Sequence, residues 1–106
     1  MSTKQATIDY LLDQSSKAGD VTAKKMFGEY ALYLQGKVIA LVCDDQLYIK
    51  PTDTGKEFLK DPIDAPPYPG AKMYFLISGD MWEDRDFLTE LFQITAEAVP
   101  FPKKKK

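Results

Sequence analysis

The residues that could carry chemistry are few, and their types restrict the chemistry before any fold is considered. The 106-residue chain has no histidine and a single cysteine, Cys43. The lack of histidine removes the commonest general base and metal ligand, and it excludes a Ser-His-Asp or Cys-His arrangement within this chain. Cys43 is flanked by Val42 and Asp44. Because a reactive thiolate needs positive charge nearby, we interpret Cys43 as a small core residue.

Two acidic groupings are candidate cation sites. Asp44 and Asp45 are adjacent, but no third ligand follows at the spacing of an EF-hand loop, and such a pair is typical of a tight turn. The acidic run from Asp80 to Asp86 favours a capped, solvated helix start over a calcium site. We therefore predict no catalytic residue, no metal and no cofactor. Acid–base chemistry by paired carboxylates stays open, because 16 acidic residues always offer an eligible pair.

The concentrated basic feature is the C-terminal run of Lys103, Lys104, Lys105 and Lys106. These are four of the 14 basic residues, so the rest of the chain has 10 basic against 16 acidic residues and a formal net charge of −6. An acidic body repels phosphate backbones, so we expect no large nucleic-acid surface on the folded part. We interpret residues 101–106 as a basic disordered tail that could add weak nucleic-acid contacts.

Length and composition indicate one soluble globular domain, which we place at residues 1–100, ahead of the tail. Hydrophobic residues make up 44% and charged residues 28% of the chain, which is an ordinary balance for a folded protein. No apolar run approaches the roughly 20 residues needed to span a bilayer, and residues 1–10 lack an apolar signal region. The lone cysteine agrees with a reducing compartment. The sequence thus predicts a cytoplasmic protein without a membrane partner.

The segment 26–50 organises the chain, because it has the pattern of consecutive antiparallel strands. Residues 30–34 alternate with a period of two, and Gln35-Gly36 follows as a hairpin loop. Residues 38–43 are apolar on both faces, as expected of a central strand. The alternation assigns Val38, Ala40 and Val42 to one face and Ile39, Leu41 and Cys43 to the other. Residues 46–50 form the next strand, and residues 22–27 precede as a partner strand.

Helices are predicted on either side of these strands. Residues 3–18 have helical spacing, with Ser2 and Gln5 as a capping box. Residues 54–60 have the spacing of a short helical turn that begins at Thr54. Residues 61–70, rich in proline, indicate an irregular loop, and residues 72–78 indicate another strand. A final helix is capped by Asp80 and ends before Pro100.

This order predicts an α+β fold: an antiparallel meander of about five strands with an N-terminal and a C-terminal helix. Two helices can cover one face of such a sheet. The second face also needs cover, as indicated by Ile39, Leu41, Tyr33 and Tyr48. Two alternatives stay open: the helices and the proline-rich loop cover both faces between them, or the second face binds a second copy or another protein.

The segment Met26, Phe27, Gly28, Glu29 and Tyr30, followed by Gly36-Lys37 and by residues 40–50, resembles the N-terminal domain of the TfoX/Sxy family, bacterial regulators of natural competence. Residues 65–72 resemble it too, and the resemblance covers roughly residues 5–100. It implies a non-enzymatic regulator linked to transcription. Full-length members carry a second, C-terminal domain, so this chain looks like a stand-alone N-terminal domain. The family supplies no catalytic residues.

Three hypotheses for function follow, in order of preference. The first is a protein-interaction module in transcriptional regulation, which uses the segment 26–30 and partners from the transcription machinery. The second is nucleic-acid association through Lys103–Lys106. The third is a small ligand-binding or enzymatic domain that uses carboxylates and tyrosines, and it requires a concave pocket with convergent polar groups.

Overall fold

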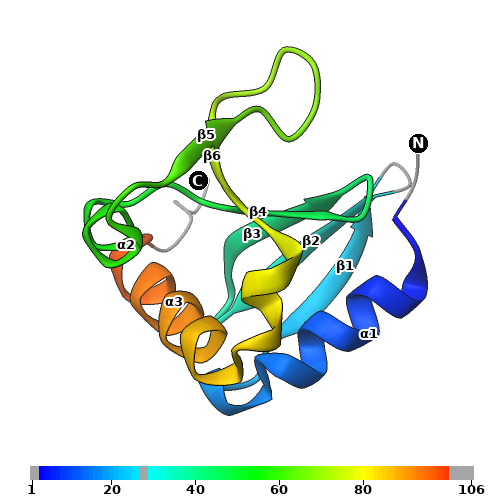
Figure 1. The fold of residues 1–106 in the computed structure, drawn as a ribbon. Coiled ribbons are helices and arrows are strands. Elements are labelled where there is room, and N and C mark those ends of the chain that lie inside the picture. Colours follow the sequence, from blue (N-terminus) through cyan, green and yellow to red (C-terminus); the bar gives the residue numbers. More distant parts are fainter. Residues whose placement is uncertain (1–2, 27–28, 101–106) are drawn as a thin grey trace, which may run out of the picture.

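The computed structural model describes residues 3–26 and 29–100, and it forms one antiparallel sheet with helices packed on one side (Figure 1). The strand order is β1-β2-β3-β4-β6-β5. The strands are β1 (Thr22–Met26), β2 (Glu29–Leu34), β3 (Lys37–Cys43), β4 (Gln46–Ile49), β5 (Ile63–Ala65) and β6 (Tyr74–Ile77). The helices are α1 (Gln5–Gln14), α2 (Asp53–Leu59) and α3 (Arg85–Ala98), with 3-10 helices η1 (Ser16–Ala18) and η2 (Gly79–Glu83). The predicted α+β class is confirmed.

The sheet in the described residues has six strands where about five were expected. The additional strand, β5, lies inside the segment that we predicted as an irregular loop. Ile63 pairs with Leu76 and Ala65 with Tyr74, so β5 forms the outer edge of the sheet beyond β6. Pro62 and Pro66 flank this strand. Proline is tolerated at a sheet edge but not in its middle, which explains why β5 is short and why the prolines suggested a loop.

Both predicted hairpin turns are present, and each uses left-handed backbone at two successive residues. Gln35 and Gly36 have φ of 58° and 76°, and Asp44 and Asp45 have φ of 53° and 61°. In a two-residue hairpin loop, positive φ at both residues gives the loop a twist that matches the twist of the flanking strands. Aspartate tolerates this region better than most residues, so the Asp-Asp pair fits the turn.

Strand β3 contains a β-bulge, so the predicted assignment of its side chains to the two faces of the sheet is partly wrong. Leu32 pairs with Ala40 but Tyr33 pairs with Val38, so Ile39 is an extra residue opposite β2. The bulge interrupts strict alternation. Ile39 therefore lies in the core beside Ala40, both at 0% exposure, whereas Val38 is half-buried. Strict alternation had placed Ile39 on the face of Leu41.

The N-terminal helix is shorter than predicted. It begins at Gln5 and ends at Gln14, and a 3-10 turn continues to Ala18. Ser2, the predicted capping residue, lies outside the described residues. The N-cap residue is Lys4, whose side chain makes no capping bond. A distant carboxylate takes its place: Asp45 Oδ1 accepts hydrogen bonds from the Lys4 backbone N–H at 2.9 Å and from the Thr7 hydroxyl at 2.8 Å.

Two further caps were assigned to the wrong residue. The hydroxyl of Thr52, rather than Thr54, accepts the Gly55 N–H at the start of α2. Asp84, rather than Asp80, accepts the Phe87 N–H at the start of α3, because residues 79–83 first form a 3-10 helix. Side-chain caps are short-range signals, and several polar residues in each segment could have satisfied them.

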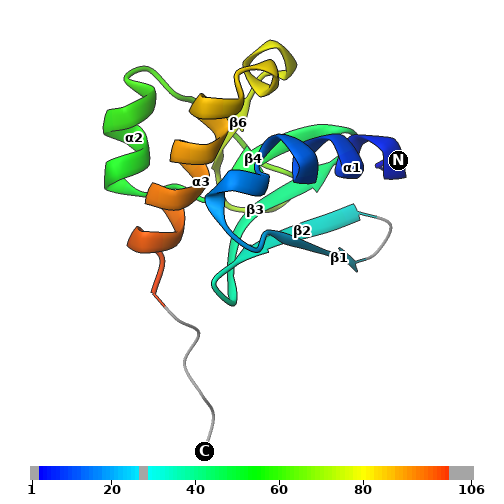
Figure 2. The ribbon, with the colours of Figure 1, turned by 90° about the horizontal axis from the view of Figure 1, so that it is seen from below.

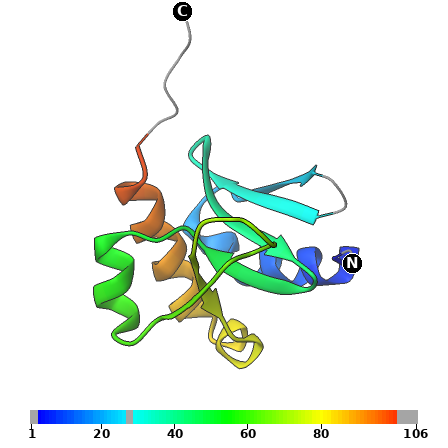
Figure 3. The same ribbon diagram turned by 90° about the horizontal axis from the view of Figure 1, so that it is seen from above.

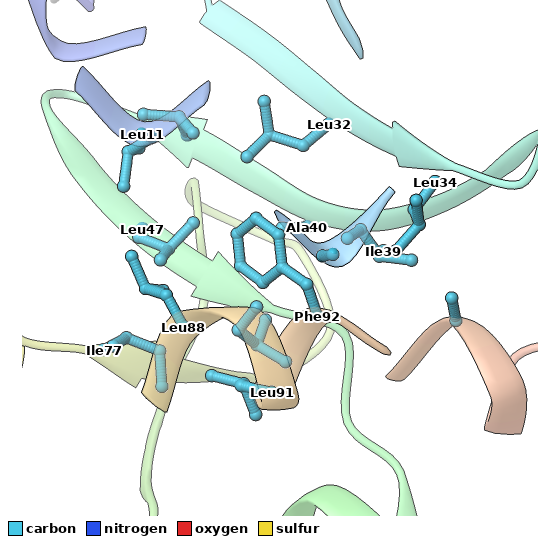
Figure 4. Close-up of a cluster of buried hydrophobic side chains, with 14 of the residues drawn as sticks. Leu11, Leu32, Leu34, Ile39, Ala40, Leu47, Ile77, Leu88, Leu91 and Phe92 are labelled. Atoms are coloured by element: carbon cyan, nitrogen blue, oxygen red, sulfur yellow. The ribbon is translucent and has the colours of Figure 1, made fainter. Parts of the chain in front are cut away.

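The hydrophobic core lies between the sheet and the helix layer. Figure 2 shows α1 and α3 in front of the sheet. Phe92 of α3 lies at the centre of this interface at 0% exposure (Figure 4). Side chains from α1, α3 and four strands surround it: Leu11, Leu32, Ile39, Leu47, Ile77, Leu88 and Leu91. The two terminal helices thus cover one face of the sheet, as the sequence predicted.

The second face has a different cover. The loop of residues 66–73, between β5 and β6, arches over it on the side away from the helices (Figures 1 and 3). The helices cover one face and the loop covers part of the other, so the alternative in which helices and loop cover both faces between them is correct in part. We call the second face the open face, because the loop covers it only in part.

Candidate binding groove on the open face

The register of the paired strands determines which side chains lie on the open face. Residues paired across antiparallel strands share a face, and the observed pairs connect all six strands in one row. This row is mostly apolar. It runs from β1 to β5 through Lys24, Ala31, Leu41, Tyr48, Leu76 and Ile63.

A groove lies on this face between the loop and the β1–β2 end of the sheet. It consists of two neighbouring cavities of about 460 and 480 Å³ that share Glu29, Cys43 and Tyr68. The first cavity is completed by Met26, Tyr30 and Leu41. The second is completed by Asp44, Gln46, Tyr48, Pro66, Pro67 and Pro69. We refer to both together as the open-face groove.

The proline-rich loop forms one wall of the open-face groove. Pro67 and Tyr48 are buried, so the loop packs onto the sheet there. Tyr68 at the loop tip is 56% exposed and stands at the junction of the two cavities. Since each proline fixes φ and lowers the entropy lost on ordering, the loop can present Tyr68 without a hydrogen-bonded element of its own.

Glu29 is held at the opposite side of the groove by two distant segments. Its Oε1 accepts the Thr3 hydroxyl at 2.6 Å and the Asp44 backbone N–H at 3.0 Å. Thr3 is itself buried, at 7% exposure, and its hydroxyl oxygen accepts the Asp45 N–H at 3.2 Å. The N-terminal segment and the β3–β4 turn therefore fix the position of this carboxylate.

The electrostatics of the groove disfavour further negative charge. Burial raises the pKa of the Cys43 thiol to about 11, and the carboxylates of Glu29 and Asp44 contribute to the rise. Burial also raises the pKa of Tyr48, with smaller effects from Cys43, Asp44 and Glu29. A thiol with this pKa is protonated at neutral pH, so Cys43 is not an activated nucleophile. This agrees with its interpretation as a packing residue.

The structure places three of the predicted interaction residues at one end of the open-face groove. Met26, Glu29 and Tyr30 line the first cavity, although the Tyr30 hydroxyl donates to Gln5 Oε1 in α1 at 3.1 Å. Phe27, Gly28 and Lys103–Lys106 lie outside the described residues. A binding role for the segment 26–30 stays a prediction.

The sequence did not identify most of the other residues that line the open-face groove. The sequence pattern predicts an irregular loop at Tyr68 and a tight turn at Asp44, and neither prediction indicates a groove. Leu41 and Tyr48 carried a usable signal, because their strands are apolar on both faces and we expected the second face to need cover. The proline-rich loop was one expected cover of the sheet, but its position over β4 depends on the pairing of β5 with β6, which no sequence pattern indicated.

Other features of the described residues are weaker candidates for a functional site than the open-face groove. A broad hollow of about 520 Å³ at the β2–β3 turn is lined mainly by polar residues, among them Asp20, Thr22 and Lys24. Residues 3–26 and 29–100 contain no group of three or more Cys, Asp or Glu side chains placed to hold a metal ion. In the same ranges, no helix is long and apolar enough to cross a membrane.

The fold and the groove define a small α+β domain with a helix layer on one sheet face and a partly roofed apolar groove on the other. Residues 13–99 match the family model of the TfoX N-terminal domain. The chain therefore belongs to the TfoX N-terminal domain family, as its sequence resemblance implied. It is also 40% identical, over all of its 106 residues and 91% of the relative, to an uncharacterized 12.7 kDa protein from the trpE 5′ region of Spirochaeta aurantia.

Proposed function

We propose that this chain is a non-enzymatic, cytoplasmic protein-interaction domain that acts in transcriptional regulation and binds its partner through the open-face groove. The observation that carries the proposal is that two exposed apolar side chains, Met26 and Tyr68, line the same cavity of that groove, with further exposed apolar side chains on the same loop and sheet. Met26, Tyr68 and Met73 are 40%, 56% and 57% exposed. Ile63, at the β5 edge of the same face, is 59% exposed.

This clustering is unusual for a surface that binds nothing. Exposed apolar residues are commonly scattered singly, whereas a contiguous patch with a polar rim marks an interaction site. Among the large apolar side chains exposed in the described ranges, only Tyr10, at 39%, belongs to the helix layer. The other four lie on the strands and the loop that border the open face. Methionine and tyrosine are also enriched at protein interfaces.

Binding is favoured over catalysis by the chemistry of the groove. An active site needs a group with a pKa tuned toward the working pH. In the groove, the pKa values of Cys43 and Tyr48 move upward, away from neutrality. The chain has no histidine to serve as a base. Membership of the TfoX N-terminal domain family supports a regulatory role, because family members with both domains are linked to transcription of competence genes.

The proposal is tested by affinity capture with matched variants. The full chain is immobilised and exposed to nuclease-treated lysate of its host, and retained proteins are identified by mass spectrometry. Met26→Gln with Tyr68→Ser removes two exposed groove side chains at little cost to folding. Tyr10→Ser, on the outer surface of α1, is the control. We expect a component of the transcription machinery to be retained by wild type and by the control, and lost with the groove variant.

Two results would contradict the proposal. Equal retention by the groove variant would place the binding surface elsewhere. Retention that disappears only when residues 103–106 are deleted, or that is seen only when the nuclease treatment is omitted, would favour nucleic-acid association through the lysine tail.

A further inference from the structure

The open-face groove combines an apolar lining with two carboxylates. Glu29 and Asp44 both line the second cavity, and no basic residue is found among its described lining residues. Within the described part of the chain, the hydrogen bonds to the Glu29 carboxylate are made by Oε1, which leaves Oε2 available. The Asp44 side chain is exposed at the mouth of the cavity.

The aromatic and aliphatic residues of the groove suit the body of a long cationic side chain. Tyr48 and Tyr68 line the cavity that contains both carboxylates, and the face of a tyrosine ring attracts an ammonium or guanidinium group. Met26 and Leu41 line the adjoining cavity. Lysine and arginine lay their aliphatic stems along apolar surface of this kind while the charged group reaches a polar partner.

The two carboxylates also act on the titrating groups of the groove. Burial is the largest cause of the raised pKa of Cys43 and of Tyr48, and Glu29 and Asp44 add to both shifts. The part of the effect that comes from the carboxylates stabilises a cation at the same position.

From this charge complementarity we propose that the bound partner segment carries an arginine or lysine flanked by apolar residues, and that this basic side chain enters the groove between Tyr68 and the carboxylates of Glu29 and Asp44. The inference rests on the proposed function and specifies its ligand. A second copy of this chain is a less suitable occupant. A two-fold contact centred on the groove would bring the same carboxylates of both copies together, and the projecting loop would stand between the sheets.

The experiment is a selection of random short peptides on the immobilised full chain, followed by charge neutralisation in both partners. The best binder is synthesised with its arginine or lysine, and again with citrulline or acetyl-lysine at that position, which preserves the shape and removes the charge. Both peptides are titrated against wild type and against Glu29→Gln with Asp44→Asn. Glutamine retains the oxygen that accepts the Thr3 and Asp44 hydrogen bonds, so the fold is preserved.

We expect the enriched peptides to contain a basic residue next to an aromatic or aliphatic one. Neutralising that residue should weaken binding to wild type about tenfold or more, as for loss of a charge-assisted contact. The preference for the charged peptide should be much smaller for the doubly neutral protein, because the energetic coupling between the cation and the two carboxylates is then gone and only its attraction to the tyrosine rings is left. Enrichment of neutral or acidic peptides, absence of any enriched peptide, or a citrulline peptide that binds wild type as well as the parent would overturn the inference.

These outcomes distinguish a failure of the proposed ligand from a failure of the proposed function. If lysate capture depends on Met26 and Tyr68 but peptide binding shows no preference for a basic residue, the interaction surface stands and the cationic ligand is wrong. If lysate capture does not depend on Met26 and Tyr68, the proposed function itself fails.

Discussion

Asp45 in the β3–β4 turn accepts a 2.8 Å hydrogen bond from the Thr7 hydroxyl in the first turn of α1, across 38 positions of sequence. The same carboxylate oxygen accepts the Lys4 N–H at 2.9 Å. Asp45 thus performs for α1 the task that a local N-cap side chain ordinarily performs. This contact fixes the N-terminal segment beside the β3–β4 turn, and the same segment supplies the Thr3 hydroxyl that holds Glu29 in the groove.

Replacing the distant cap should destabilise the domain. Asp45→Ala removes the acceptor for Lys4 and Thr7 and also places alanine at a φ of 61°, where a non-glycine residue without a polar side chain is strained. We expect the midpoint of thermal unfolding to fall by a few degrees. Asp45→Asn tolerates the same backbone and retains an oxygen, so it should lose less. Circular dichroism melts of both variants provide the measurement, and equal melting of Asp45→Ala and wild type would contradict the cap.

The negative charge of Asp45 should make the stability of the folded protein depend on pH in the acid range. The Lys4 amide and the Thr7 hydroxyl lower the pKa of this carboxyl below its ordinary value. A lowered folded-state pKa stabilises the folded protein above the unfolded-state pKa, about 3.9 for aspartate. That stability is lost as the pH falls through the folded-state pKa. The urea midpoints of wild type and Asp45→Asn should therefore differ at neutral pH and converge in strong acid. A difference that is constant with pH would exclude the charge.

The β-bulge can be tested by two alanine substitutions in neighbouring residues. Ile39 is fully buried and Val38 is half-buried. Ile39→Ala should cost about 2–5 kcal/mol of unfolding free energy, whereas Val38→Ala should cost about 1 kcal/mol or less. A strand with unbroken alternation would place Val38 with Ala40 in the core and reverse the order. Denaturant unfolding of the two variants decides between these arrangements.

Lys37 should contribute to stability despite being a charged residue in a buried position. It is 7% exposed, and its Nζ donates to the Ala96 carbonyl at 2.6 Å, near the C-terminus of α3. A cation is favoured there by the helix dipole. Lys37→Met keeps the apolar stem and should cost about 1–3 kcal/mol, because a buried carbonyl loses its charged donor. Lys17→Met, an exposed lysine in η1, is the matched control and should change stability by less than about 0.5 kcal/mol.

Cys43 should react slowly with alkylating reagents. With a pKa of about 11 in the folded protein against 9.0 ordinarily, its thiolate fraction near pH 8 falls about a hundredfold. Iodoacetamide should therefore modify the native chain far more slowly than the denatured chain, as followed by intact mass. Comparable rates for the two forms would mean that Cys43 is exposed and activated, which would revive a catalytic interpretation of the groove.

The sequence by itself determined the elements that depend on local pattern. Period-two alternation located β2, β3 and β4, and Gly36 and the Asp44-Asp45 pair located the turns between them, because positive φ restricts which residues can occupy a tight hairpin. Helical spacing located α1 and α3 and their apolar faces. The motif of residues 26–30 also pointed to the family that the comparison of residues 13–99 confirmed.

Only the tertiary structure decided the features that join distant segments. The bulge at Ile39 requires the paired strand β2 to define it, and β5 exists because β6 offers an edge. The cap of α1 comes from Asp45, which no local capping pattern could indicate. The groove has the same origin: Glu29, Cys43 and Tyr68 meet because sheet pairing brings the proline-rich loop over β4. Contacts of this kind are made by packing in three dimensions, and spacing along the chain does not encode them.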